Sequence, residues 1–228
     1  MSRITLGLCL ALVLSAPSAW AKTPLTTETA KVSYLLGLQF GTNLTRQGVE
    51  LDLAAIAEGL QDGTKGVKPQ LSEEEAAKVM NDFRQKLTAK MEAQRSKMAG
   101  ENQKSGQAFL DKNKKEAGVK VTKSGLQYKV LTEGKGAKPK TDSKVKVHYE
   151  GKLTDGTLFD SSYKRGEPAV FPVTGVIPGW TEALGMMSVG SKWHLVIPAE
   201  LAYGDRGMGG AIPPNSVLTF DVELLGIE

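Results

Sequence analysis

The sequence predicts an α+β protein: a twisted antiparallel sheet wrapped on a short helix, preceded by an all-α region and one long linking helix. Two observations predict this class. Apolar residues recur at helical spacing from about Val32 to Met91, and from about Val119 they alternate with polar residues at the period of a strand. The expected parts are a signal peptide at 1–21, a helical region at 22–71, the linking helix at 72–118 and the sheet domain at 119–228.

The first 21 residues have the pattern of a cleaved secretory signal. Arg3 precedes an apolar run from Ile4 to Leu14, and Ala19-Trp20-Ala21 fits the small-x-small cleavage site. The run is about half of the ~20 residues that span a bilayer, so a membrane anchor is the weaker interpretation, and we expect no transmembrane segment later in the chain. Cys9 is the one cysteine and lies in this segment, so the exported protein has to be stable without disulfides.

Neither the charge nor the histidines favour a nucleic-acid or metal site. The formal net charge is +4, and no basic stripe is interleaved with aromatic rings. His148 and His194 fall on polar strand faces without a second His or Cys at ligand spacing, so we interpret them as surface residues. Gly134-Lys135-Gly136 lacks the strand, helix and Ser/Thr of a phosphate-binding loop. We expect no nucleic acid, metal or cofactor.

Two short helices are expected in the helical region. Thr27 can cap the first, and Asp52 can cap the second, with Gly63 as its stop. Two such helices bury too little surface to be stable alone, and the exported chain offers them no disulfide, so we expect a protein partner. Gly37 and Gly41 lie one turn apart, where they either permit close helix–helix approach or only weaken the helix.

The linking helix begins with a strong signal, because Ser72 and Glu75 fit a capping box. An apolar stripe follows at Ala76, Met80, Phe83, Leu87 and Met91. Beyond it the sequence is polar on all sides, so a helix as far as about Lys115, ~65 Å long, would have a packed first half and a bare second half. Gly100 and Gly106 favour a bend or fraying there. The methionines indicate interface packing rather than a metal or redox device.

Three strands of the sheet domain are expected to have one wet face each. Their alternating apolar positions are Val145, Val147 and Tyr149, then Trp193, Leu195 and Ile197, then Leu218, Phe220, Val222 and Leu224. Asp155-Gly156 is a strong hairpin signal between the first of these strands and a strand at Phe159. Thr181–Leu184 is long enough for only a short helix.

Aromatic residues gather in Gly- and Pro-rich segments of this domain, together with one acid that is flanked by Phe and Ser, Asp160. The rings are Tyr149, Phe159, Phe171, Trp180, Tyr203 and Phe220. No nucleophile–base pair accompanies them, so the pattern suits binding and desolvation better than proton transfer or hydrolysis. Trp180, Tyr203 and Asp160 fall at turns, which favours a site, whereas Phe171 and Phe220 fit a site or a strand core equally well.

The same segments carry a resemblance to a known family. Between about Gly125 and Leu225, VHYEGKL, DGTLFDSS, VIPGWTEAL, LAYG and IPPNSVLTFDVELL follow the order and spacing of the FKBP-type peptidyl-prolyl isomerase domain. The helical region and linking helix resemble the macrophage infectivity potentiator branch, whose members are exported V-shaped homodimers joined through their N-terminal helices. The resemblance implies an FKBP-like sheet domain, a dimerisation region at 22–71 and activity without a cofactor.

The resemblance also implies a role for each matching residue. Asp160 would lie beside the twisting amide, and the Ile177 N–H and the Tyr203 hydroxyl would hold substrate carbonyls. The rest of the proline pocket would be Tyr149, Phe159, Phe171, Val176, Trp180, Ile212 and Phe220, with Trp180 as the floor.

Three positions depart from the best-known small cytosolic members of the family. Ala169 and Ala211 stand where those members carry phenylalanine and isoleucine, and Met208 replaces a more polar residue. These departures leave the reaction intact, but they leave the ligand affinity and the preference for the residue before proline open.

Two functions fit these features. The first is a peptidyl-prolyl cis-trans isomerase (rotamase) that assists the folding of proline-containing, unfolded or partly folded exported proteins by desolvating and stabilising the twisted X–Pro amide. The alternative is a dimeric chaperone or surface adhesion module in which the pocket only binds proline. The expected location is the periplasm or the periphery of the outer membrane, and macrolide-type inhibitors are expected ligands.

Overall fold

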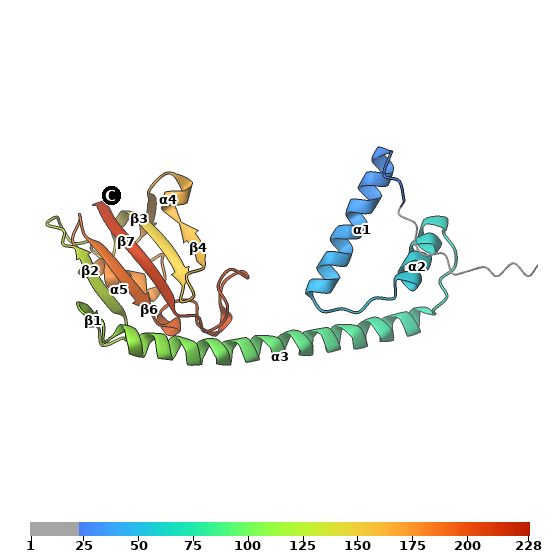
Figure 1. The fold of residues 1–228 in the computed structure, drawn as a ribbon, viewed down its shortest axis with the longest axis horizontal. Coiled ribbons are helices and arrows are strands. Elements are labelled where there is room, and N and C mark those ends of the chain that lie inside the picture. Colours follow the sequence, from blue (N-terminus) through green and yellow to red (C-terminus); the bar gives the residue numbers. More distant parts are fainter. Residues whose placement is uncertain (1–22) are drawn as a thin grey trace, which may run out of the picture. The chain divides into compact units, whose positions relative to one another are not determined.

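The computed structural model describes residues 23–228, which form two compact units, the first ending at Val79 and the second spanning Met80–Glu228 (Figure 1). The expected signal peptide at 1–21 lies outside the described residues. Among the residues from 23 onward, no helix is both long and apolar enough to cross a membrane. The predicted ends of the helical region at residue 71 and of the linking segment at residue 118 stay predictions.

The first unit contains α1 (Glu28–Arg46) and α2 (Leu53–Lys65), and both predicted N-caps are confirmed. The Thr27 hydroxyl accepts from the Ala30 N–H at 3.1 Å, and an Asp52 carboxylate oxygen accepts from two amides of α2. The predicted stop at Gly63 is wrong. α2 continues to Lys65 and ends at Gly66, whose left-handed backbone (φ 64°) forms the C-cap that Gly63 does not provide.

The linking helix is α3 (Glu73–Asn113), 41 residues and about 62 Å long. The capping box is confirmed, since the Ser72 N–H donates to Glu75 at 3.0 Å and the Glu75 N–H donates to the Ser72 hydroxyl at 3.2 Å. The helix continues through Gly100 and Gly106 without a break, so the fraying expected there is absent from this helix.

The expectation of a bare second half of α3 is wrong, whereas the packing of its first half was expected against a partner and stays a prediction. Met80 and Met91, on the apolar stripe, are about half exposed in the chain. The second half instead lies against the sheet domain, where Gly106 is buried and a Cβ added there would meet a Val217 methyl carbon at 2.8 Å. Polar side chains such as Asn102 make this contact through hydrogen bonds, which an apolar-stripe criterion does not detect.

The second unit contains an antiparallel sheet of order β1-β2-β6-β7-β3-β4, with β5 paired to β3. Its strands are β1 (Val119–Val121), β2 (Gln127–Thr132), β3 (Lys144–Leu153), β4 (Leu158–Ser161), β5 (Ala169–Pro172), β6 (Lys192–Ile197) and β7 (Leu218–Ile227). The predicted hairpin is confirmed: β3 turns into β4 through Asp155-Gly156, where Gly156 has φ 88° and its N–H donates to the Leu153 carbonyl at 3.0 Å.

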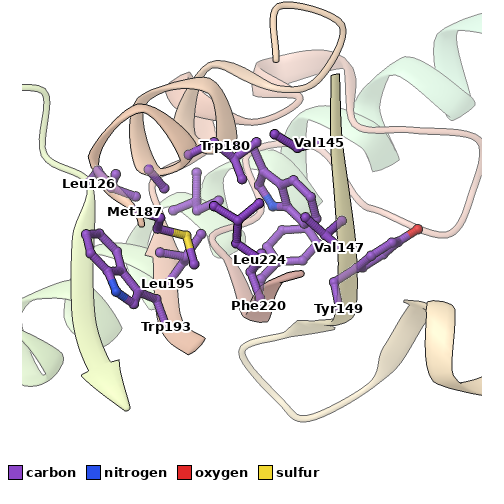
Figure 2. Close-up of a cluster of buried hydrophobic side chains, with 14 of the residues drawn as sticks. Leu126, Val145, Val147, Tyr149, Trp180, Met187, Trp193, Leu195, Phe220 and Leu224 are labelled. Carbon is purple, nitrogen blue, oxygen red and sulfur yellow. The ribbon is translucent and has the colours of Figure 1, made fainter. Parts of the chain in front are cut away.

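The core of this unit lies between the sheet and α5 (Pro178–Met186) (Figure 2). The predicted alternation is confirmed, because the inward residues of β3 and β7 are buried together, with Val145 and Val222 fully inaccessible. α5 is longer than the predicted Thr181–Leu184. It begins at Pro178, whose fixed φ suits the first position of a helix and whose missing N–H costs nothing there. Short helices α4 (Ser162–Arg165), η1 (Ala199–Leu201) and η2 (Gly204–Arg206) complete the unit.

The packing of α3 predicts opposite responses at its two glycines. Gly100→Ala should stabilise the second unit by about 1 kcal/mol, because a Cβ there meets nothing within 4 Å and alanine favours the helix. In Gly106→Ala the same gain is offset by about 1–3 kcal/mol of overpacking against buried Val217. Urea unfolding followed by the fluorescence of Trp180 and Trp193 measures both; equal stabilisation by the two variants would contradict the contact.

Candidate active site

A cavity of about 350 Å³ opens over the core of the second unit. Strands β3, β4, β5 and β7 supply its walls, and the segment before α5 and the loop around η2 close it. The lining residues are Tyr149, Phe159, Asp160, Phe171, Gly175, Val176, Ile177, Trp180, Tyr203, Met208 and Phe220. A cavity of this size lies at the lower end of the range of small-ligand sites.

Trp180 forms the centre of an aromatic cluster beneath the cavity. Its ring is edge-on to Tyr149 at 5.2 Å and to Phe220 at 5.3 Å between centroids. Phe171 makes a third edge contact with Trp180 at 6.0 Å. The first turn of α5 holds Trp180 against the sheet with 4% of its surface exposed, so its rotation is restricted from three sides (Figure 2).

Gly151 makes room for two of the rings. A Cβ at this β3 position would lie 2.5 Å from a ring carbon of Phe220 and 2.8 Å from one of Phe159. Phe159 and Phe220 are therefore able to meet edge to face, 5.5 Å apart, across the space that the glycine leaves. The glycine of the VHYEG segment is therefore needed for the phenylalanine of the DGTLF segment to pack in this position.

Asp160 is the one carboxylate among the lining residues, and two hydrogen-bond donors hold it. The Tyr149 hydroxyl donates to one carboxylate oxygen at 2.5 Å, and Arg165 donates to the other at 2.5 Å. Arg165 also donates to the Tyr149 oxygen at 2.8 Å, and its guanidinium carbon lies 5.4 Å from the centre of the Tyr149 ring. The three side chains form a closed triangle on one wall of the cavity.

The triangle sets the charges of the wall. Burial raises the pKa of the Asp160 carboxyl, but the hydrogen bonds from Tyr149 and Arg165 and the positive charge of Arg165 outweigh burial, so the pKa lies below its ordinary value of 3.8. Burial and the hydrogen bond to Asp160 raise the pKa of Tyr149, and burial and the Asp160 charge raise the pKa of Tyr203. At neutral pH Asp160 is therefore a carboxylate and both tyrosines are hydrogen-bond donors.

The structure brings nine of the ten predicted site residues together around this cavity. The exception is Ile212, which is 2% exposed within the core cluster and is not among the lining residues. Asp160 and Trp180 were predicted to fall at turns, which is wrong, because Asp160 lies in β4 opposite Gly151 and Trp180 lies in α5. Tyr203 does lie between two short turns, η1 and η2.

Three residues around the cavity were not predicted as site residues. Gly175 and Met208 line it, and Arg165 holds Asp160 from outside. The sequence shows a positive charge, Arg165, five residues after Asp160, which could have suggested an ion pair. The pair forms because α4 reverses the chain and brings Arg165 back to β4. Met208 was identified as a departure, but its position in a loop gave no reason to place it in the wall.

The site thus belongs to the class of aromatic clefts that bind a compact apolar group and offer a few hydrogen-bond donors and one carboxylate at the rim. Comparisons with known proteins identify the family. The sequence profile described as FKBP-type peptidyl-prolyl cis-trans isomerase matches residues 135–225, and the profile of the domain amino terminal to it matches residues 29–130.

Relatives of similar length agree. The chain is 44% identical over 223 residues to outer membrane protein MIP of Legionella longbeachae, covering 98% of this chain and 94% of that protein. It is 48% identical over 199 residues to the FKBP-type 22 kDa peptidyl-prolyl cis-trans isomerase of Escherichia coli K12, covering 87% and 95%. The crystal structure of FkpA from Escherichia coli is similar with a TM-score of 0.69 and 42% identity, covering 89% of this chain and 98% of that one.

The chain belongs to the FKBP-type peptidyl-prolyl cis-trans isomerases. The predicted fold class and enzyme class are confirmed, and a module that uses the pocket for binding alone is not favoured.

Arg165 gives a testable consequence for Asp160. In Arg165→Ala the pKa of Asp160 should rise, because burial remains while a donor and a positive charge are lost. The folded-state pKa of wild-type Asp160 lies below 3.8, so its stabilising contribution is present above that pH and is lost as the pH falls through the folded value. The variant should lose this contribution at a higher pH.

Carbon-13 NMR titration of the Asp160 carboxyl measures the shift, and the unfolding midpoint measured from pH 2 to 7 follows the stability. Lys164→Ala is the matched control, since it removes an exposed cation next to Arg165 in α4. An unchanged Asp160 pKa in Arg165→Ala would show that the triangle does not set this charge.

Proposed function

We propose that this cavity rotates X–Pro bonds in exported proteins and that the lining residues have the roles suggested by their chemistry. The observation that carries the proposal is the gathering of nine predicted residues from six separate segments around one aromatic cavity. Tyr149, Phe171 and Phe220 would be its walls and Trp180 its floor.

The reaction needs no covalent step. Rotation about an X–Pro bond has a barrier of about 18–20 kcal/mol because twisting destroys amide resonance, and unassisted it takes tens to hundreds of seconds. A twisted amide has a less polarised carbonyl than a planar one, so it loses less on leaving water. A dry aromatic cavity that holds proline therefore favours the twisted state over the planar one, which is the requirement for catalysis.

Two donors near the cavity suit the carbonyls of a bound peptide. Within residues 23–228, neither the Ile177 N–H nor the Tyr203 hydroxyl makes a hydrogen bond to another group of the chain. Tyr203 is protonated at neutral pH, since the ordinary tyrosine pKa of 10 already ensures this and burial raises its pKa further. We assign these groups to substrate carbonyls and the charged Asp160 to a position beside the twisting amide.

The substrates are proposed to be proline-containing chains that are unfolded or partly folded after export. The pattern of residues 1–21 supports export, and a relative from Legionella longbeachae is named an outer membrane protein. We place this protein in the periplasm or at the periphery of the outer membrane. The same cavity would take macrolide-type inhibitors through its aromatic walls.

We also propose a homodimer joined through the N-terminal helices. No residue of α1 or α2 is buried in the single chain, and Leu36 and Phe40, one turn apart on α1, are 62% and 55% exposed. Helices with apolar faces this exposed need a partner to be stable in water. The match of the amino-terminal family profile over residues 29–130 supports the same conclusion.

The catalytic roles predict an ordered loss of activity. Wild-type protein should accelerate cis-to-trans conversion of an X–Pro peptide in a protease-coupled assay, and Tyr203→Phe should lower kcat/KM about fivefold, as the loss of one ordinary hydrogen bond does. Asp160→Ala should lower it as well, because it removes the charge and an acceptor for Tyr149.

Tyr128→Phe is the matched control, because its ring stacks on Trp193 rather than lining the cavity. If Tyr203→Phe and Asp160→Ala both kept the wild-type rate, the assigned roles would be wrong.

If the dimer forms through the apolar face of α1, a charge placed on that face should weaken it. Leu36→Asp should shift the full-length protein toward monomer in sedimentation velocity at micromolar concentration, because it places a carboxylate on an apolar helix face. Thr42→Asp adds the same charge at an exposed polar position of α1 and should remain dimeric. A wild-type monomer at this concentration would contradict the proposal, since the exposed α1 face would then have no partner.

A further inference from the structure

The loop of residues 203–216, called the pocket loop here, forms part of the cavity wall that lies outside the strands. It contributes Tyr203 and Met208 to the lining. Its tip is closed by a bridge in which the Met208 N–H donates to the Ile212 carbonyl at 2.8 Å and the Ile212 N–H donates back at 3.0 Å. At its base the Asn215 N–H donates to the Gly204 carbonyl at 2.8 Å.

The second half of α3 is bonded to both ends of the pocket loop. Arg95 donates from Nη2 to the Asp205 carbonyl at 2.9 Å, and Asn102 donates from Nδ2 to the Pro214 carbonyl at 2.8 Å. Asn215 of the loop donates back to the Ala99 carbonyl at 3.4 Å. All these groups belong to the compact unit Met80–Glu228.

The spacing on the helix makes this a single contact face. Positions 95, 99, 102 and 106 follow steps of four, three and four residues, so they lie in one row along α3. Gly106 ends the row, where its missing side chain lets the helix approach Val217, immediately after the loop. A row that reaches a loop before and after its tip restricts the loop at two points.

We propose that Arg95 and Asn102 are positioning residues of the substrate site: α3 holds the pocket loop in the conformation that presents Tyr203 and Met208 to the substrate. The helix that links the two parts of the chain is thereby also a support of the active-site wall. This inference rests on the proposed role of Tyr203 in substrate binding.

The Arg95 and Asn102 hydrogen bonds are expected to raise the fraction of molecules in which the pocket loop has the conformation that binds substrate. Both α3 donors bind main-chain carbonyls, so they act on the path of the loop whatever its side chains are. Without them the loop keeps its own bridge at the tip and its bond at the base, and the 3.4 Å bond from Asn215 to the Ala99 carbonyl alone still ties it to α3 by a hydrogen bond. The loop is then freer to move as a unit away from the cavity. Substrate binding must then select the competent conformation, and the apparent affinity falls by the competent fraction.

The test compares the full-length double variant Arg95→Ala/Asn102→Ala with wild type. The KM for an X–Pro peptide should rise about fivefold with kcat retained. This is the change expected if the pocket loop is in its competent conformation in about one fifth of the molecules. Simple loss of folded enzyme would instead lower kcat and leave KM unchanged. Hydrogen–deuterium exchange should become faster in residues 204–216 and stay unchanged in β3.

Matched variants distinguish the loss of the Arg95 and Asn102 hydrogen bonds from a general effect of substitutions in α3. Gln94→Ala/Gln103→Ala removes exposed neighbours on α3 and should behave as wild type. Arg95→Lys keeps a donor, so its KM should rise much less than the KM of Arg95→Ala.

An unchanged KM in the double variant, or a fall in kcat alone, would overturn the inference. Inactive wild-type protein would instead contradict the proposed function, and the exchange comparison in residues 204–216 would still decide whether α3 holds the loop.

Discussion

The edge contacts of Trp180 are the interaction on which the rest of the site depends. Tyr149, Phe171 and Phe220 come from three strands, and each meets the same indole within about 6 Å. Truncation of a buried tryptophan costs about 3–5 kcal/mol, a large fraction of the stability of a domain. Here the ring belongs both to the core cluster and to the cavity lining. The packing that folds the domain therefore also fixes the shape of the cavity, and no separate energy is needed to organise the site.

A second constraint concerns the one carboxylate in an aromatic wall. An unpaired charge at such a place would be disfavoured, and protonation would remove the charge from the site. Asp160 avoids both outcomes because it lies at the rim, partly exposed, between two donors from β3 and α4. The arrangement orients Tyr149 as well, since its hydroxyl is both donor to Asp160 and acceptor from Arg165. A negative charge is thereby kept beside the cavity without a buried ion pair.

Features that depend on local sequence could be predicted, and features that depend on shape could not. The caps at Thr27, Asp52 and Ser72 and the hairpin at Asp155-Gly156 rest on bonds between near neighbours, and the strand alternation records which face is buried. Eight of the nine predicted cavity residues lie in the family motifs, and Phe171 lies between two of them. The need for a glycine at Gly151 and the role of Arg165 depend on segments that meet only in the folded chain. Ile212 shows the reverse case, a motif residue that the fold places in the core instead of the lining.

The largest difference from the sequence-based expectation concerns α3, and its reason is general. An apolar stripe predicts where a helix packs through side-chain burial, so a polar helix half was expected to be bare. Arg95 and Asn102 instead bond to carbonyls of a loop that has no strand neighbours to satisfy them, and there polar side chains are the suitable partners. The contact also fixes the register of the helix. Removing one residue before Arg95 leaves the row at 95, 99, 102 and 106 in place, whereas removing one within the row turns the remaining positions by about 100°. The second half of the linking helix is therefore bound to the geometry of the pocket loop, and a change of length before Arg95 leaves that contact intact.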